Sequence, residues 1–214
     1  LASVFNTIML KDIIERYDIR NVPFLNNLIV FYADTTGKLT SANSISKYMK
    51  SQNENVSSNL ILLYRSFYSE AFLIDVVSRY DIHGKKIFES NEKIYWDDIG
   101  LRNLKASGGM DSYIEKVIEN AVYKQLSFLG YDIKVGVLNA GEVDFVCTKS
   151  GQTIYVQASY IIAEDTTRKR EFGPLEKIRD NYPKYVISAT PYLTQRNENG
   201  IIHLSLRKFL TEGL

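Results

Sequence analysis

The chain has one cysteine, no long apolar run and almost no excess of charge of either sign. The single cysteine, Cys147, excludes an intramolecular disulfide and favours a reducing compartment, so we expect a cytoplasmic protein. No apolar run approaches the roughly 20 residues that span a bilayer, so we expect no membrane partner. The 26 basic and 25 acidic residues give a net charge of +1, which excludes a protein that grips phosphates through its overall charge. Any contact with nucleic acid must therefore come from local basic patches.

The length of 214 residues allows one or two domains with a substantial core. The chain starts at Leu1 rather than at a methionine, in what looks like the middle of a helix. We therefore expect the C-terminal part of a longer protein.

The first half of the chain predicts helices followed by a β-hairpin. Pro23 suits the first turn of a helix, and Ser41 is a plausible N-cap for the next one. The predicted helices are residues 1–20, residues 23–34, a helix behind Ser41 and residues 57–72, and the predicted strands are residues 72–82 and 92–99. This is the element order of a winged helix, a variant of the helix-turn-helix.

The helix at 57–72 occupies the place of a recognition helix, but its composition favours another role. It carries only one Arg and one Glu, Arg65 and Glu70, whereas a base-reading helix presents Arg, Lys, Asn or Gln to groove edges. Its aromatic residues at helical spacing are Tyr64, Phe67, Tyr68 and Phe72. We expect these rings in the core or at a domain interface, and the helix to pack rather than to read bases.

The predicted hairpin tip holds two lysines, Lys85 and Lys86. They are candidates for phosphate contacts, and a solvated tip with no nucleic-acid role is the alternative. The best domain boundary follows at residues 105–110, KASGGM, where small residues interrupt the pattern.

The second half predicts an αβββαβ order of elements. An amphipathic helix starts near 111 and ends at Gly130, and a polar segment at 163–180 is expected to be helical on either side of Gly173-Pro174. The predicted strands are residues 131–138, 142–149, 153–160 and 184–190, with a last pair at 201–206 and 207–213.

The segment GEVDFVCTKSGQTIYVQASY, residues 141–160, predicts a hairpin with a polar face. If Ser150-Gly151 forms a two-residue loop, Asp144 faces Gln157 and Glu142 faces Ser159. Period-two alternation then places Val143, Phe145 and a buried structural Cys147 together on the opposite, apolar face. Metal-dependent nucleases place an Asp on one strand of such a hairpin and Glu-x-Lys on the next. The segment therefore raises the question of a nuclease, a nuclease with altered chemistry or a domain that has lost the chemistry.

Several phrases of the chain together resemble the C-terminal half of prokaryotic AAA+ ATPases. They are SANSISKYMKSQ, RYDIHGKKI, KIYWDDIGLRN, GGMDSYIEKVIENAVYKQLSFLGYDIKVG, GEVDFVCTKSGQTIYVQASY and TTRKREFGPLEKIRDNYPKYVIS. The resemblance implies an α+β or α/β fold in which a winged helix precedes a PD-(D/E)XK nuclease-like domain of unassigned function. The implied parts are a linking helix at 1–20, a winged helix at 21–104 and a nuclease-like domain at 105–214. ATP would bind only in the missing ATPase domain, a further partner of this chain, because no G-x-x-x-x-G-K-[ST] motif occurs here.

The resemblance also implies a degenerate catalytic site. Glu119 on the helix and Asp144 on the strand match the acids that hold Mg²⁺ in active members. The Glu-x-Lys pair falls on Gln157 and Ser159, which supply an amide and a hydroxyl in place of an acid and an ammonium. A relocated cation, Lys124 or Lys134, is the alternative that would restore a working site.

A basic cluster follows the third strand of this half, at Arg168, Lys169 and Arg170. It is a candidate for binding a phosphate backbone beside the acidic site. The alternative is a solvated helix start in which Arg170 pairs with Glu171, Asp165 or Asp144.

Three functions follow from these patterns. The first is a non-catalytic module that binds a nucleic acid such as DNA, or a partner, as the output half of an ATP-driven protein. The second is a Mg²⁺-dependent nuclease built on Glu119 and Asp144. The third is a protein-interaction module that packs on the ATPase half.

Overall fold

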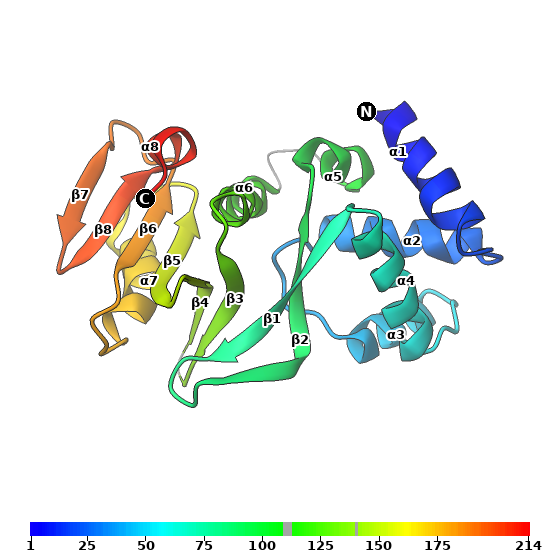
Figure 1. Cartoon of the computed structure of the whole chain (residues 1–214), viewed down its shortest axis with the longest axis horizontal. Helices are drawn as coiled ribbons and strands as arrows, with labels where there is room; N and C mark the ends of the chain where they lie inside the picture. Colours follow the sequence, from blue (N-terminus) through cyan, green and yellow to red (C-terminus); the bar gives the residue numbers. More distant parts are fainter. Residues whose placement is uncertain (109–112, 140) are drawn as a thin grey trace. The chain divides into compact units, whose positions relative to one another are not determined.

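The computed structural model describes residues 1–108, 113–139 and 141–214, which form a mixed α+β fold (Figure 1). Two compact units are present. The first is Leu1–Val76 with Ser90–Tyr113, and the second is Val77–Glu89 with Ile114–Leu214. Among the described residues, no helix is both long and apolar enough to cross a membrane.

The first unit is mainly helical. Its elements are α1 (Ala2–Thr7), the π-helix η1 (Ile8–Glu15), α2 (Val22–Asp34), α3 (Ala42–Ser51), α4 (Ser58–Glu70), α5 (Ile99–Lys105) and the base of a hairpin of β1 (Ile74–Asp81) and β2 (Lys86–Trp96). Helices α2, α3 and α4 start within one residue of the predicted positions. The single helix expected at 1–20 is instead α1 followed by a π-helix that ends at Glu15, and the helix at Ile99–Lys105 was not predicted. Pro23 lies in the first turn of α2. Ser41 caps α3 in a reciprocal capping box with Ser44, which confirms the predicted N-cap.

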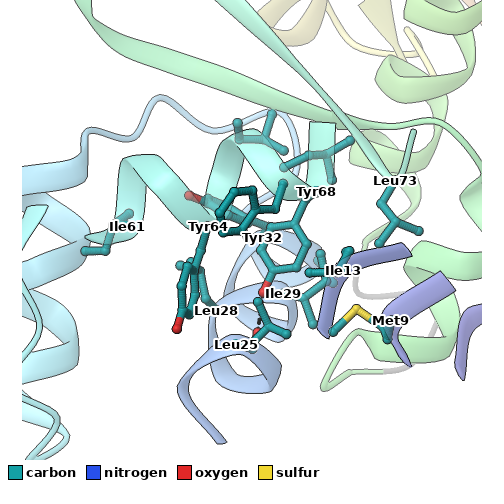
Figure 2. Close-up of a cluster of buried hydrophobic side chains, with 14 of the residues drawn as sticks. Met9, Ile13, Leu25, Leu28, Ile29, Tyr32, Ile61, Tyr64, Tyr68 and Leu73 are labelled. Atoms are coloured by element: carbon teal, nitrogen blue, oxygen red, sulfur yellow. Dashed lines mark hydrogen bonds between the residues drawn. The ribbon is translucent and has the colours of Figure 1, made fainter. Parts of the chain in front are cut away.

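Aromatic and aliphatic side chains of these helices form the core of the first unit (Figure 2). Tyr64, Phe67 and Tyr68 of α4 are buried there, as predicted. Phe72 is the exception, because the residue is 77% exposed and lies outside the core. Phe72 follows the end of α4 with a φ of 55°, so the chain turns before the helical spacing can carry this ring inward.

The charged residues of α4 are engaged within the first unit. Arg65 makes a close ion pair with Glu92 of β2. Glu70 accepts a hydrogen bond of 2.6 Å from the Tyr17 hydroxyl. Both charges are therefore held by neighbours in the same unit, which favours the packing role expected for this helix.

The second unit is built on a mixed sheet (Figure 1). Beside the hairpin tip, its elements are α6 (Ile114–Phe128), β3 (Asp132–Leu138), β4 (Gly141–Lys149), β5 (Gln152–Ser159), α7 (Asp165–Glu176), β6 (Lys184–Ser188), β7 (Gln195–Glu198), β8 (Ile201–Ser205) and α8 (Leu206–Glu212). The described strands run in the order β2-β1-β3-β4-β5-β6-β8-β7. Strands β3, β4 and β5 are an antiparallel meander, and α7 then leads to β6, which is parallel to β5.

Three expectations for this half need correction. Helix α7 runs through Gly173-Pro174 instead of breaking there. Pro174 lies in its last turn, where only one intrahelical hydrogen bond is lost. Residues 207–213 are not a strand but belong largely to α8, which starts because Ser205 caps the backbone N–H of Lys208. The short strand β7 was not predicted.

Helices cover both faces of this sheet. The Phe145 ring of β4 lies 6.2 Å from the Tyr123 ring of α6. The next residue, Val146, packs in a cluster with Phe172 and Leu175 of α7. Since successive strand residues point to opposite faces, α6 and α7 pack on opposite sides of the sheet.

Candidate functional site

The β4–β5 hairpin has the predicted register at its turn. Backbone pairs run from Phe145–Val156 to Lys149–Gln152. Ser150 and Gly151 form the loop with φ angles of 50° and 77°, as a type I′ turn requires. The sequence arithmetic for this end of the hairpin is confirmed.

At the other end of the hairpin, which we call the open end, side chains instead of backbone pairs connect the two strands. The last backbone pair is Phe145–Val156. Beyond it, the backbone N–H of Asp144 donates to Oε1 of Gln157 at 3.2 Å, and the backbone N–H of Ala158 donates to Oδ2 of Asp144 at 3.0 Å. Asp144 therefore contacts Gln157 as predicted, but both side chains are used to satisfy backbone groups of the separated strands.

A β-bulge in β4 explains the separation. The pairing with β3 shifts between Lys134–Val146 and Gly136–Val143, so β4 has one extra residue around Asp144. The bulge reverses the alternation, and Val143 joins Val146 in the cluster beneath α7. The predicted shared face of Val143, Phe145 and Cys147 is therefore wrong. Cys147 is buried as expected, and burial raises the pKa of its thiol.

Helix α7 adds a carboxylate that the sequence analysis did not select. The Gln157 amide donates to Oε2 of Glu171 at 3.0 Å, and Nε of Arg170 donates to Oε1 of Glu171 at 2.8 Å. The same guanidinium lies 3.7 Å from Oε1 of Glu115 in the first turn of α6. The open-end cluster thus comprises Glu115, Asp144, Gln157, Arg170 and Glu171. The one available signal was the expected pairing of Arg170 with Glu171.

Burial dominates the electrostatics of this cluster. It raises the pKa of Glu171, and the nearby charge of Asp144 acts in the same direction. The hydrogen bonds from Arg170 and Gln157 lower that pKa, but they offset burial only in part. Asp144 is itself only 8% exposed. The cluster holds three carboxylates against the single guanidinium of Arg170, so its acidic charge is compensated only in part.

The remaining residues of the predicted catalytic set lie nearby in the fold. Glu119 is half-buried on α6, one turn after Glu115. Ser159 is buried at the end of β5, and its hydroxyl has no hydrogen-bond partner among the residues that the structure describes. Its hydroxyl cannot replace the ammonium of a lysine.

The donor set does not fit a Mg²⁺ site. Within the described ranges, no group of three or more His, Cys, Asp or Glu side chains is arranged to hold a metal ion. One oxygen each of Asp144 and Gln157 and both carboxylate oxygens of Glu171 already accept an N–H, whereas Mg²⁺ demands octahedral coordination by oxygens. The alternative cation Lys134 makes a close ion pair with Asp132.

The predicted basic residues differ in how far their charge is compensated. Arg168 lies 2.8 Å from Glu198 and 3.9 Å from Glu176. Lys169 is exposed on α7, and Lys85 and Lys86 are exposed at the hairpin tip.

Comparison with known proteins identifies the family. Residues 1–112 match the family model of DUF8612, a domain of unknown function, and the chain belongs to this family. It is 33% identical over 201 residues to an uncharacterized protein of Haemophilus influenzae. The matched region covers 94% of this chain and 49% of that protein. It is 25% identical over 181 residues to the uncharacterized protein MJ1544 of Methanocaldococcus jannaschii. This matched region covers 83% of this chain and 40% of MJ1544. The chain spans about half the length of these relatives or less.

The structure search returned protein VC1899 from Vibrio cholerae. The match covers 90% of this chain and 50% of that chain, with a TM-score of 0.29 and 12% identity. At this TM-score the match carries no argument about fold or function.

Proposed function

We propose that this chain is a non-catalytic module that binds nucleic acid, with the second unit a nuclease-like domain that has lost the ability to cut. The observation that carries the proposal is the use of Asp144 and Gln157 as acceptors for backbone N–H groups at the open end. A carboxylate held in this way supports the structure of the strands, and it leaves a poor donor set for the metal that cutting requires.

Two further features support the loss of catalysis. In the resemblance to nucleases, Ser159 falls at the position of the catalytic lysine, and it is buried. Arg170 supplies the positive charge nearest the cluster, but it is bound to Glu171 and lies near Glu115.

The helices and hairpin of the first unit support a winged helix as part of the same proposal. In this winged helix α4 would pack instead of reading bases, because Arg65 is paired with Glu92 and Glu70 accepts a hydrogen bond from Tyr17. Lys85 and Lys86 lie at the hairpin tip, which belongs to the second unit, and would be the wing residues that touch phosphates.

The parent protein is proposed to carry an ATPase domain ahead of this chain. This part of the proposal rests on the resemblance to AAA+ ATPases and on the relatives, which are about twice as long as the matched region. The module would then act as the output half of an ATP-driven protein, and the ATPase domain would be its partner.

Binding across salt concentration tests the proposal. We expect labelled DNA to bind the chain at low salt and to lose affinity as salt rises, because phosphate contacts release counterions. Asp144→Asn should leave the affinity unchanged, since Asp144 serves the strands. A complete lack of DNA binding at low salt, with tight binding to the ATPase half, would replace the proposal with a protein-interaction module.

One observation favours a second candidate, a Mg²⁺-dependent nuclease. Glu171 of α7 brings a second buried carboxylate into the electrostatic field of Asp144. It could stand in for the Glu that the resemblance expects on β5, where this chain has Gln157. In this alternative Glu171 and Asp144, with Glu119 from α6, would be the acidic residues. Cleavage that disappears in Asp144→Asn would support it.

A further inference from the structure

A cavity of about 720 Å³ lies in the second unit, away from the open-end cluster. Its walls come from the hairpin tip, from strands β3, β4 and β5, and from the loop after α7. The lining residues include Tyr80, Lys85, Ile87, Lys134, Tyr155 and Tyr182. A volume of this size falls in the range that binds small organic ligands.

Three tyrosines give the cavity aromatic walls. Tyr155 is buried, and its hydroxyl donates to Oδ2 of Asp180 at 2.6 Å, so its ring is held in place. The Tyr182 ring lies 6.3 Å from that ring, tilted by 53°, and is 47% exposed. Tyr80 lines the same cavity from β1. Tyr182 therefore offers a ring face on which a flat ligand can stack.

Cationic side chains border these rings. Lys85 lines the cavity and is exposed, and Lys134 lines it as well but is ion-paired with Asp132. A second cavity of about 730 Å³ shares Lys85 with the first and adds Lys177 and Arg179, which are both exposed. The two cavities together form what we call the tyrosine groove, a run of aromatic surface edged with positive charge.

The acidic residues of the groove are largely compensated. Asp180 accepts hydrogen bonds from the Tyr155 hydroxyl and the backbone N–H of Tyr182, and it lies 3.9 Å from Nζ of Lys184. Glu176 lies 3.9 Å from Arg168. An anionic group entering the groove would thus meet exposed cations and acids whose charge is already shared.

We propose that the tyrosine groove binds a nucleobase that carries a phosphate, with the base stacked on Tyr182 and the phosphate held by Lys85 and the neighbouring cations. This inference rests on the proposed function and gives it a location and a ligand class. It differs from the expectation for Arg168 and Arg170, since both of those guanidiniums are engaged in ion pairs. The same chemistry occurs in a free nucleotide and in a single strand of DNA or RNA.

Fluorescence anisotropy of the whole chain with a labelled ten-nucleotide single strand tests the groove. We expect Tyr182→Ala to weaken binding about tenfold, which is the loss expected when one stacked base is released. Tyr182→Phe keeps the ring and should bind like the wild type. Tyr192→Ala is the matched control, because Tyr192 is fully exposed outside the groove, and it should also bind like the wild type.

Lys85→Ala tests the phosphate contact separately. It should weaken binding and reduce the slope of affinity against salt, whereas Lys11→Ala, at an exposed position of the first unit, should change neither. Competition with mononucleotides then distinguishes the two sources of the ligand. Displacement of the strand by a mononucleotide supports a nucleotide site, and displacement by oligonucleotides alone supports a single-strand site.

Two outcomes would overturn the inference, and they can be told apart. If the strand binds but Tyr182→Ala and Lys85→Ala bind like the wild type, the groove is wrong and the proposed function stands. If no strand binds at low salt, the groove and the nucleic-acid function are both wrong.

Discussion

The two ends of the β4–β5 hairpin are built in different ways. At the turn, Ser150 and Gly151 adopt positive φ angles and five backbone pairs follow in regular register. At the open end, the strands separate at a bulge, and the side chains of Asp144 and Gln157 take over as backbone partners. The turn is held by local backbone preferences, whereas the open end depends on particular polar side chains.

This difference bears on how a nuclease-like site is judged. A carboxylate at the expected strand position can support metal-dependent cleavage only if its oxygens are available to bind the metal. At the open end, Asp144 and Gln157 serve neighbouring N–H groups, and Glu171 serves Gln157 and Arg170. The cluster is therefore first a structural device, which is why we propose binding without cutting.

Loss of the Asp144 carboxylate should have the largest effect on the hairpin. Asp144→Ala leaves the part-buried N–H of Ala158 without its acceptor, so we expect a loss of about 2 kcal/mol in the free energy of opening. Hydrogen exchange of the β5 amides measures it. Asp144→Asn retains an acceptor oxygen and should lower the free energy of opening by less. The control Lys85→Ala should change that free energy by less than about 0.5 kcal/mol. Equal protection of β5 in the wild type and Asp144→Ala would contradict the structural role.

The turn should give a smaller effect. Gly151 has a φ of 77°, so Gly151→Ala places a Cβ in a left-handed conformation and should cost about 1 kcal/mol. Ser150→Asn, at a φ of 50°, should be neutral or slightly stabilising because Asn tolerates this region. Urea denaturation followed by circular dichroism compares the two variants. A larger loss for Gly151→Ala than for Asp144→Ala would reverse the comparison between the ends.

Glu171 should produce the smallest effect, one that depends on pH. Burial raises its pKa in the folded state, so ionisation disfavours folding. At low pH, the wild type and Glu171→Gln should differ little in their free energy of unfolding, and we take the stability of the wild type relative to the variant there as the reference. It should then fall as the pH rises from the ordinary carboxyl value of about 4.3 through the raised pKa. Urea midpoints from pH 3 to pH 8 follow this difference. A Glu171→Gln variant that is less stable near neutrality would mean that the Arg170 ion pair outweighs burial.

The sequence predicted the local parts of this hairpin and missed the tertiary ones. The register followed from Ser150-Gly151 because a two-residue loop dictates pairing. The bulge at Asp144 depends on pairing with β3, and its sequence signal is weak. Gly136 lies opposite it, where a Cβ would come within 2.8 Å of Cγ2 of Val146. Glu171 was not selected because its role arises only when α7 packs over β5.

The same distinction applies to the rest of the fold. Capping by Ser41 was readable from the sequence because the cap is local. The tyrosine groove was not readable, since Tyr80, Lys134 and Tyr182 come together only through the sheet. Helix α8 was missed because its Ser205 cap follows a strand directly and no turn residues intervene.

The cleavage assay tests the central claim most directly. Labelled single-stranded and duplex DNA would be incubated with the chain and with Asp144→Asn in the presence of Mg²⁺ or Mn²⁺. We predict the same background rate for both proteins, with the wild type still binding the DNA. Metal-dependent cleavage by the wild type that Asp144→Asn abolishes would contradict the account and assign Asp144 to catalysis.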